Sequence, residues 1–138
     1  MKSTAKSAQN SSHSTARTRS SKAMAEAGLT AFFSIAEDWG LTTDQQRTLL
    51  GEPKKTSFFK WKKDKQVELS QDTLERLSYI IGIYKAVHLL FSTNTALEWM
   101  KNRNKEPLFL GLSPLEFMLK GRVVNLSDVR RYLDWARG

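Results

Sequence analysis

The most informative helix signals of the chain lie in residues 96–138, which read ALEWMKNRNKEPLFLGLSPLEFMLKGRVVNLSDVRRYLDWARG. A short helix is predicted to begin at Ser113, because Ser is a favoured N-cap and Pro114 fits the first helical position. Glu116 completes a capping box with Ser113. Gly121 is predicted to end this helix as a C-cap.

The last helix of this stretch is capped by Asn125 or Ser127 and is predicted to run to the final residues. Apolar residues follow at a spacing of three and four, which is typical of one buried helix face. These residues are Leu126, Val129, Tyr132 and Leu133. We expect the carboxylate of Gly138 to lie just past the end of this helix.

A longer helix is predicted upstream, from the N-cap Ser70 to about Phe91. Its apolar positions form a face wider than one packing partner needs, so it is expected to join two halves of the protein and to pack against a second copy. They are Leu74, Leu77, Ile80, Ile81, Tyr84, Val87, Leu90 and Phe91. Gly82 costs about 1 kcal/mol relative to Ala in mid-helix, which a close helix crossing explains.

Three shorter helices are predicted between residues 24 and 63. The first covers 24–39 and ends at Gly40. A capping box over residues 42–45 begins the second, which Gly51 ends, and the third covers about 56–63. Two short helices joined by a tight turn that contains glycine form a helix-turn-helix, whose second helix reads the major groove of DNA.

Helical spacing divides the third helix into two faces. Phe58 and Trp61 are predicted to point inward as core residues. On the opposite face, Thr56 and Lys60 are candidates for base-edge contacts, and Phe59 can touch a thymine methyl. Lys55 and Lys63 are candidates for phosphate contacts, and the alternative is that these lysines only form a solvated face. The candidate DNA-binding residues are Lys55, Thr56, Ser57, Phe59, Lys60 and Lys63.

Charge is concentrated at two places. The formal net charge is +8, and residues 1–22 contribute five basic residues, seven Ser and no acidic residue. Such a segment buries little apolar surface, so we expect it to be disordered, either as a solvated tail or as a basic arm for DNA. Residues 53–65 hold six lysines against one acid, a cluster that can displace counterions from a phosphate backbone.

Several classes of protein are disfavoured. The chain has no cysteine and two separate histidines, so neither a disulfide framework nor a metal site is expected. No apolar run is long enough to span a membrane, and no secretory signal is apparent, so we expect a cytoplasmic protein. Nucleotide-binding and hydrolase motifs are missing, and we expect neither a cofactor nor catalytic activity.

Residues 96–138 resemble the toxin-binding domain of the Xre/MbcA/ParS antitoxins. The similarity lies in the order and spacing of Ala96, Trp99, Asn102 or Asn104, Leu110-Gly111, Ser113-Pro114-Leu115, Gly121, Val129, Leu133 and Arg137-Gly138. Upstream, residues 39–51, 58–63 and 69–91 are similar to the Xre helix-turn-helix half of the same family. That family usually has Ser or Thr and Tyr at the positions of Thr56 to Phe59, so the base that is read here is open.

The resemblance implies an all-α protein with an N-terminal Xre-like helix-turn-helix domain and a small helical toxin-binding domain, joined by a long helix. We predict a basic arm at 1–22, a DNA-binding domain at 23–68, a connecting or dimerisation helix at 69–93 and a toxin-binding domain at 94–138. The implied partners are a RES-domain toxin that consumes NAD, promoter DNA and a second copy of the chain.

The resemblance also implies that the C-terminal end blocks NAD entry into the toxin. Tyr132 and Trp135 are the expected aromatic anchors, because aromatic residues and Arg dominate interface energies. The full set of candidate toxin-binding residues is Arg130, Arg131, Tyr132, Trp135, Arg137 and Gly138. The alternatives are that Trp135 packs on the helix near residues 96–102, and that the protein is a stand-alone dimeric regulator.

Overall fold

The computed structural model describes the backbone of residues 2–138 and the side chains from residue 16 onward. The fold is all-helical over these residues, as the sequence predicts. The elements are α1 (Lys2–Trp39), α2 (Thr43–Leu49), α3 (Lys55–Lys63), α4 (Gln71–Leu90), α5 (Thr93–Lys101), the 3-10 helix η1 (Pro107–Phe109), α6 (Pro114–Met118) and α7 (Val123–Arg137).

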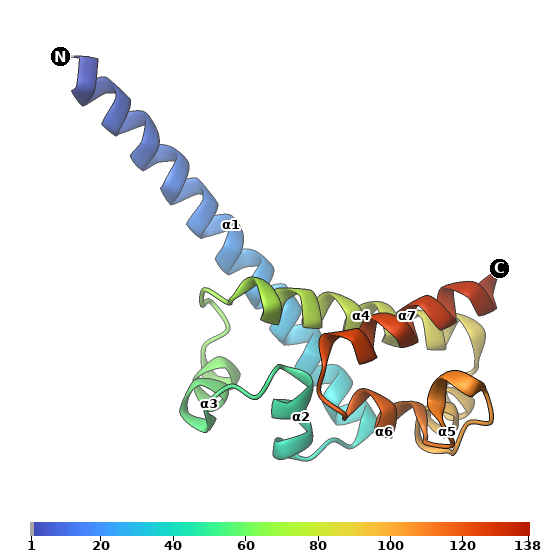
Figure 1. Cartoon of the computed structure of the whole chain (residues 1–138). Helices are drawn as coiled ribbons and strands as arrows, with labels where there is room; N and C mark the ends of the chain where they lie inside the picture. The colour runs from blue at the N-terminus through green and yellow to red at the C-terminus, as the bar shows by residue number, and fades with distance from the viewer. Residues whose placement is uncertain (1) are drawn as a thin grey trace.

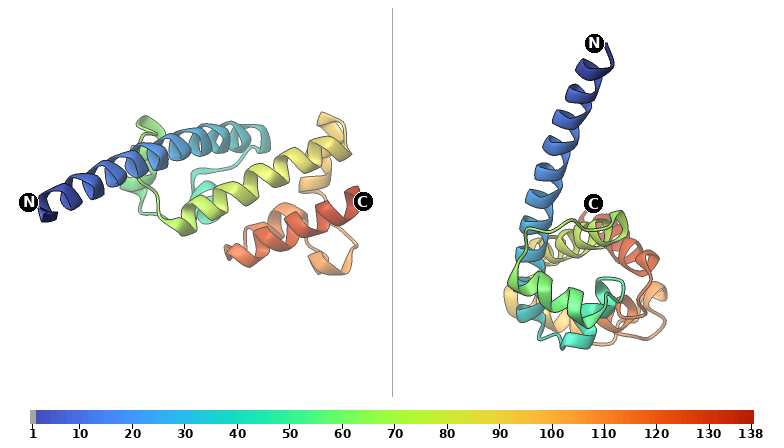
Figure 2. Two further views of the ribbon diagram at one scale, coloured as in Figure 1. Left: turned by 90° about the horizontal axis from the view of Figure 1, so that it is seen from above. Right: turned by 90° about the vertical axis from the view of Figure 1, so that its left-hand side faces the viewer.

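The helices form two layers. Seen from above, α4 lies between α1 and α7, and both of these helices pack against it (Figure 2). The short helices α2, α3, α5 and α6 lie beneath this layer (Figure 1). The long helix predicted to join the two halves therefore does so, with α1 along one side and α7 along the other.

One hydrophobic core runs through both halves. Phe32 and Leu49 from the N-terminal half, Ile80 from α4, and Phe109 and Leu133 from the C-terminal half are all completely buried. A buried polar side chain also joins the halves. The guanidinium of Arg76 in α4 donates to the carbonyl of Gly121 at 2.9 Å, contacts that of Leu49 at 3.5 Å and pairs with Asp72 at 2.9 Å.

The predicted capping boxes are confirmed. Thr42 caps α2 and Ser113 caps α6, each accepting from the backbone N–H three residues on. Gly40 and Gly121 end helices with φ of 65° and 90°, in the left-handed region where glycine is least strained. Ser70 caps α4 by accepting from the backbone N–H of Thr73.

One helix start differs from the prediction. The last helix, α7, begins at Val123, ahead of both predicted caps, and the Asn125 side chain accepts from the backbone N–H of Arg122 at 3.3 Å. Asn125 thus caps the helix from inside its first turn, because its side-chain oxygen accepts a hydrogen bond from the backbone N–H of the N-cap residue.

The N-terminal segment also differs from the prediction. Residues 2–22, predicted to be disordered, continue α1 as a helix that projects beyond the two layers (Figure 1). They contain neither Pro nor Gly, and the buried part of α1 from Ala25 onward supplies the nucleus that a helix needs. Extension from an existing nucleus is far less costly than starting a helix in isolation.

Gly82 has a specific structural role in α4. A Cβ at this position would lie 2.6 Å from the Nη1 atom of Arg130, which donates to the Gly82 carbonyl. The glycine therefore makes room for a guanidinium that joins α7 to α4, rather than for a close contact between two helix backbones.

Candidate nucleic-acid interface and C-terminal surface

The turn before α3 presents this helix to solvent. Gly51 and Glu52 both have positive φ, of 89° and 60°, which reverses the chain after α2. Arg47 in α2 donates from Nε to the carbonyl of Pro53 at 2.9 Å and so holds the turn against α2. This arrangement is the predicted helix-turn-helix, with α3 as its second helix.

The inner face of α3 is attached to α1 by aromatic side chains. Phe58 is completely buried, as predicted, and its ring lies 5.7 Å from that of Phe33 in an edge-to-face arrangement. The Nζ atoms of Lys62 and Lys65 lie 5.8 and 5.6 Å from the centre of the Phe33 ring, in cation–π geometry. Trp61 is half-buried against the same core. Lys62 and Lys65 are therefore engaged in contacts within the protein.

The outer face of α3 carries the predicted DNA-binding side chains. Five of the six are exposed: Lys55, Thr56, Phe59, Lys60 and Lys63. The Phe59 ring is 51% exposed, although its edge contacts the buried ring of Phe58 at 5.4 Å. Ser57, the sixth, is half-buried and lines a hollow between α1 and α3 together with Lys60. The result is a cationic surface with one apolar group at its centre.

A ladder of aromatic rings crosses the C-terminal half and reaches its surface at Trp135. The Trp99 ring stacks between those of Phe91, at 6.1 Å, and Tyr132, at 6.3 Å. Tyr132 then contacts Trp135 at 6.0 Å, and Trp135 itself is 74% exposed. Trp135 thus does not pack on α5, which was the alternative. It is a large apolar side chain held on the surface by a partly buried ring.

Tyr132 belongs more to the interior than the prediction implied. Its ring is half-buried and also meets Phe109 edge-on at 5.4 Å. Burial, and secondarily the negative charge of Glu106, raises the pKa of the Tyr132 hydroxyl above its usual value. The phenol therefore remains neutral at physiological pH. The Tyr132 ring thus lies between the buried aromatic rings and the exposed Trp135.

The arginines of α7 are paired within the helix. Arg130 lies 3.3 Å and Arg137 lies 4.0 Å from carboxylate oxygens of Asp134. Arg131 lies 3.8 Å from Asp128 and is largely exposed. Arg130 also donates to the Gly82 carbonyl, so this residue is first of all a link between helices. Arg131 and Arg137 retain guanidinium surface that a partner can reach.

The family model of the antitoxin Xre-like helix-turn-helix domain matches residues 18–82. These residues cover most of α1, α2, α3 and the first half of α4. The chain carries an Xre-like helix-turn-helix domain of the antitoxin type. A curated relative, the uncharacterized protein y4oB of Sinorhizobium fredii, is 47% identical over 120 residues, which are 86% of this chain and 91% of that protein. The chain belongs to the same family as this relative.

The Xre-like domain supports a role in DNA binding as an antitoxin or regulator. Among the described residues, no helix combines the length and apolarity needed to cross a membrane. The family model ends at residue 82, so the aromatic ladder and α7 lie outside the matched region.

Sequence reasoning missed two features of the surface. Hollows flank α4 on its solvent side, one against α1 and one against α7. The second is lined by three basic side chains, Lys85, Arg130 and Arg137, with a volume of about 550 Å³. Leu110 is 72% exposed with a φ of 54°. The only sequence signal near Leu110 was Gly111, which follows it and also has a positive φ. A glycine indicates a turn, but it does not indicate that the preceding residue is also in the left-handed region.

Proposed function

We propose that this protein is an antitoxin that neutralises an NAD-consuming RES-domain toxin through its C-terminal region and represses its own operon through α3. The observation that carries the DNA-binding part is the exposed cationic face of α3 in a domain of the antitoxin Xre-like type. The toxin-binding part is supported by the resemblance of residues 96–138 to toxin-binding domains and by the exposed Trp135.

On DNA, α3 enters the major groove, and two copies of the protein read half-sites about one helical turn apart. Thr56 and Lys60 lie on the outer face and reach base edges, while Phe59 supplies an apolar surface for a thymine methyl. Lys55 and Lys63, at the two ends of the helix, contact phosphates.

Alanine variants of α3 test this assignment. Thr56→Ala and Lys60→Ala should weaken the preference for operator over unrelated DNA. Lys55→Ala and Lys63→Ala should weaken all DNA binding and reduce the salt slope by about one unit each. The readout is fluorescence anisotropy with a duplex that covers the upstream region of its own gene. Lys105→Ala is the control, because this exposed lysine lies in the connector after α5. A quadruple variant combines Lys55→Ala, Thr56→Ala, Lys60→Ala and Lys63→Ala. If this variant binds operator DNA as well as the wild type does, the role of α3 is refuted.

On the toxin, Trp135 is the central anchor. Large exposed aromatic side chains supply most of the energy at protein interfaces when they enter a pocket. Tyr132 holds Trp135 in place through ring contact, so little conformational entropy is lost on binding. Arg131 and Arg137 add contacts at the rim. The end of α7 then fills the entrance through which NAD reaches the toxin.

Truncation separates the two activities. Removal of residues 135–138 should abolish inhibition of NAD consumption by the co-expressed toxin while the fold and DNA binding persist. Trp135→Ala should weaken the complex by about 2 kcal/mol or more, as for an interface anchor. Met24→Ala is the control, because Met24 is an exposed apolar residue on α1. A truncated chain that still protects cells from NAD loss refutes the blocking role.

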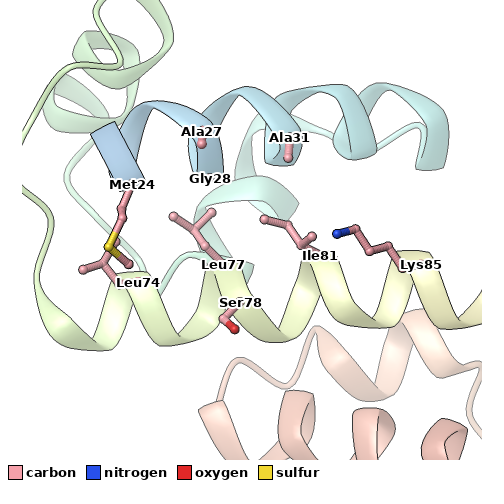
Figure 3. A pocket seen from close by; sticks show the side chains of 9 residues that line it. All are labelled: Met24, Ala27, Gly28, Ala31, Leu74, Leu77, Ser78, Ile81 and Lys85. Carbon is pink, nitrogen blue, oxygen red and sulfur yellow. The ribbon is translucent and has the colours of Figure 1, made fainter. Parts of the chain in front are cut away.

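A stand-alone dimeric regulator is the second candidate, and the groove between α1 and α4 favours it. Small and apolar side chains, together with Ser78 and Lys85, line this groove, which has a volume of about 430 Å³ (Figure 3). Met24 at one end is 60% exposed. A dimer that persists at micromolar concentration, in a chain that binds no RES protein from the adjacent gene, would favour this candidate. Light scattering and co-purification distinguish the two.

A further inference from the structure

The hollow beside α3 brings a residue of α1 to the candidate DNA-binding face. Lys22 lines this hollow together with Ser57 and Lys60, and its volume is about 410 Å³. Lys22 belongs to the segment that the sequence assigned to a disordered arm. In the structure it is a helical residue, exposed, and next to the outer face of α3.

Contacts on both sides of the hollow hold α1 and α3 in a fixed relation. Phe33 of α1 packs against Phe58 of α3, with ring centres 5.7 Å apart. The segment that follows α3 is tied to α1 as well, because the side-chain amide of Gln66 donates to a carboxylate oxygen of Glu26 at 3.2 Å. When α3 lies in a groove, the position of Lys22 relative to the DNA is therefore determined.

Helical phase separates the other basic residues of this part of α1. Each residue of an α-helix is rotated by about 100° from the one before. Arg19 precedes Lys22 by three residues and lies on the same side of α1. Arg17 precedes Met24 by seven residues, or about two turns, and so lies on the side of the α1–α4 groove that Met24 lines. All three basic side chains are exposed.

We propose that Arg19 and Lys22 form a second DNA-binding edge that contacts backbone phosphates beside the bases read by α3. This inference rests on the proposed DNA-binding function. Among the described side chains, α1 carries no acidic residue before Glu26, so its projecting part presents only positive charge to the duplex. The projecting part of α1 leads away from the body and from α3 (Figure 1), so the proposed edge is confined to the part of α1 next to the hollow that Lys22 lines.

Two carboxylates also line the hollow and limit what the site can bind. Asp64 accepts from the backbone N–H of Gln66 at 3.0 Å, and Glu68 is exposed. They disfavour a free anion inside the hollow. The ligand is therefore the phosphate backbone of a duplex already held by α3, which Lys22 and Arg19 reach with extended side chains.

The experiment compares Arg19→Gln/Lys22→Gln with Arg17→Gln in the full chain. Binding to a duplex from the upstream region of its own gene is measured by anisotropy between about 50 and 200 mM salt. Each phosphate contact contributes a slope of about −0.9, so the double variant should be shallower by about 1.8 units. Over this fourfold salt range, its affinity should fall about 12-fold less than that of the wild type. Arg17→Gln should keep the slope of the wild type.

The outcomes distinguish this inference from the proposed function. A loss of slope of about 0.9 in Arg17→Gln, half of that expected for the double variant, indicates a flexible arm and overturns the inference. An unchanged slope in the double variant overturns it as well, while the function stands if the α3 variants lose binding. Normal binding by the quadruple α3 variant overturns the proposed reading helix and this inference with it. Circular dichroism confirms that the glutamine variants are folded.

Discussion

Arg76→Met should destabilise the whole protein, because Arg76 joins its two halves through α4. Arg76 is only 8% exposed. Its guanidinium reaches the carbonyls of Leu49, at the end of α2, and of Gly121, before α7. Methionine keeps the apolar length of the side chain but removes all of these hydrogen bonds.

The size of the effect follows from the contacts. The bond to the Gly121 carbonyl is short and charge-assisted, so its loss costs about 1–3 kcal/mol. The contact to the Leu49 carbonyl, at 3.5 Å, adds little. Asp72 is about half exposed, so water replaces its partner at a cost below about 1 kcal/mol. The expected loss is about 2–3 kcal/mol, or roughly 6–12 °C in Tm for a chain of this size.

Thermal and urea unfolding measure this loss. Arg131→Met is the matched control, because Arg131 is 78% exposed in its side chain and pairs with Asp128 at 3.8 Å. The free energy of unfolding of Arg131→Met should lie within about 0.5 kcal/mol of the wild-type value. If Arg76→Met is as stable as Arg131→Met, the proposed link between the halves does not contribute to stability. A broadened transition with two midpoints would show that Arg76 also maintains cooperativity between the halves.

Three other substitutions give clear expectations. Gly82→Ala should be destabilising in the wild type, since the new Cβ displaces the guanidinium of Arg130. In an Arg130→Ala background it should stabilise by up to about 1 kcal/mol in urea unfolding. Ser113→Ala should cost about 1 kcal/mol, because the N-cap of α6 is lost, while a Thr at this position should retain most of the stability. The hydrogen bond from Tyr84 to Asp38, followed by burial, raises the pKa of Tyr84. The stabilisation from this hydrogen bond is therefore present below pH 10 and is lost as pH rises through the folded-state pKa of Tyr84. Tyr84→Phe should reduce this alkaline loss of stability, which a titration of helicity measures.

Local chemistry made most helix boundaries predictable. A capping box and a left-handed glycine act over three or four residues, so Thr42, Ser113 and Gly121 could be interpreted without knowing the fold. The division of α3 into two faces was equally accessible, because the spacing of Phe58 and Trp61 alone determines which side is buried. The same spacing placed Lys55, Lys60 and Lys63 on the outer face.

Long-range contacts were not predictable in this way. Arg76 and Gly121 are 45 residues apart, and Arg130 and Gly82 are 48 apart. Nothing in either local sequence indicates that a charged side chain will satisfy a distant carbonyl. Arg130 was for this reason assigned to a partner surface. The helical state of residues 2–22 was missed for a related reason, since it depends on a nucleus formed by the packing of α1 on α4.

The shared core has a consequence for the two proposed activities. Because α4 packs against α1 on one side and α7 on the other, neither half has a core of its own. A ligand that binds only the folded chain raises the free energy of unfolding by RT ln(1 + [L]/Kd), wherever it binds. DNA bound at α3 and a protein bound at the end of α7 would therefore each protect the whole chain from unfolding and proteolysis. An antitoxin built in this way loses both activities at once when it unfolds, and either partner alone keeps both in place.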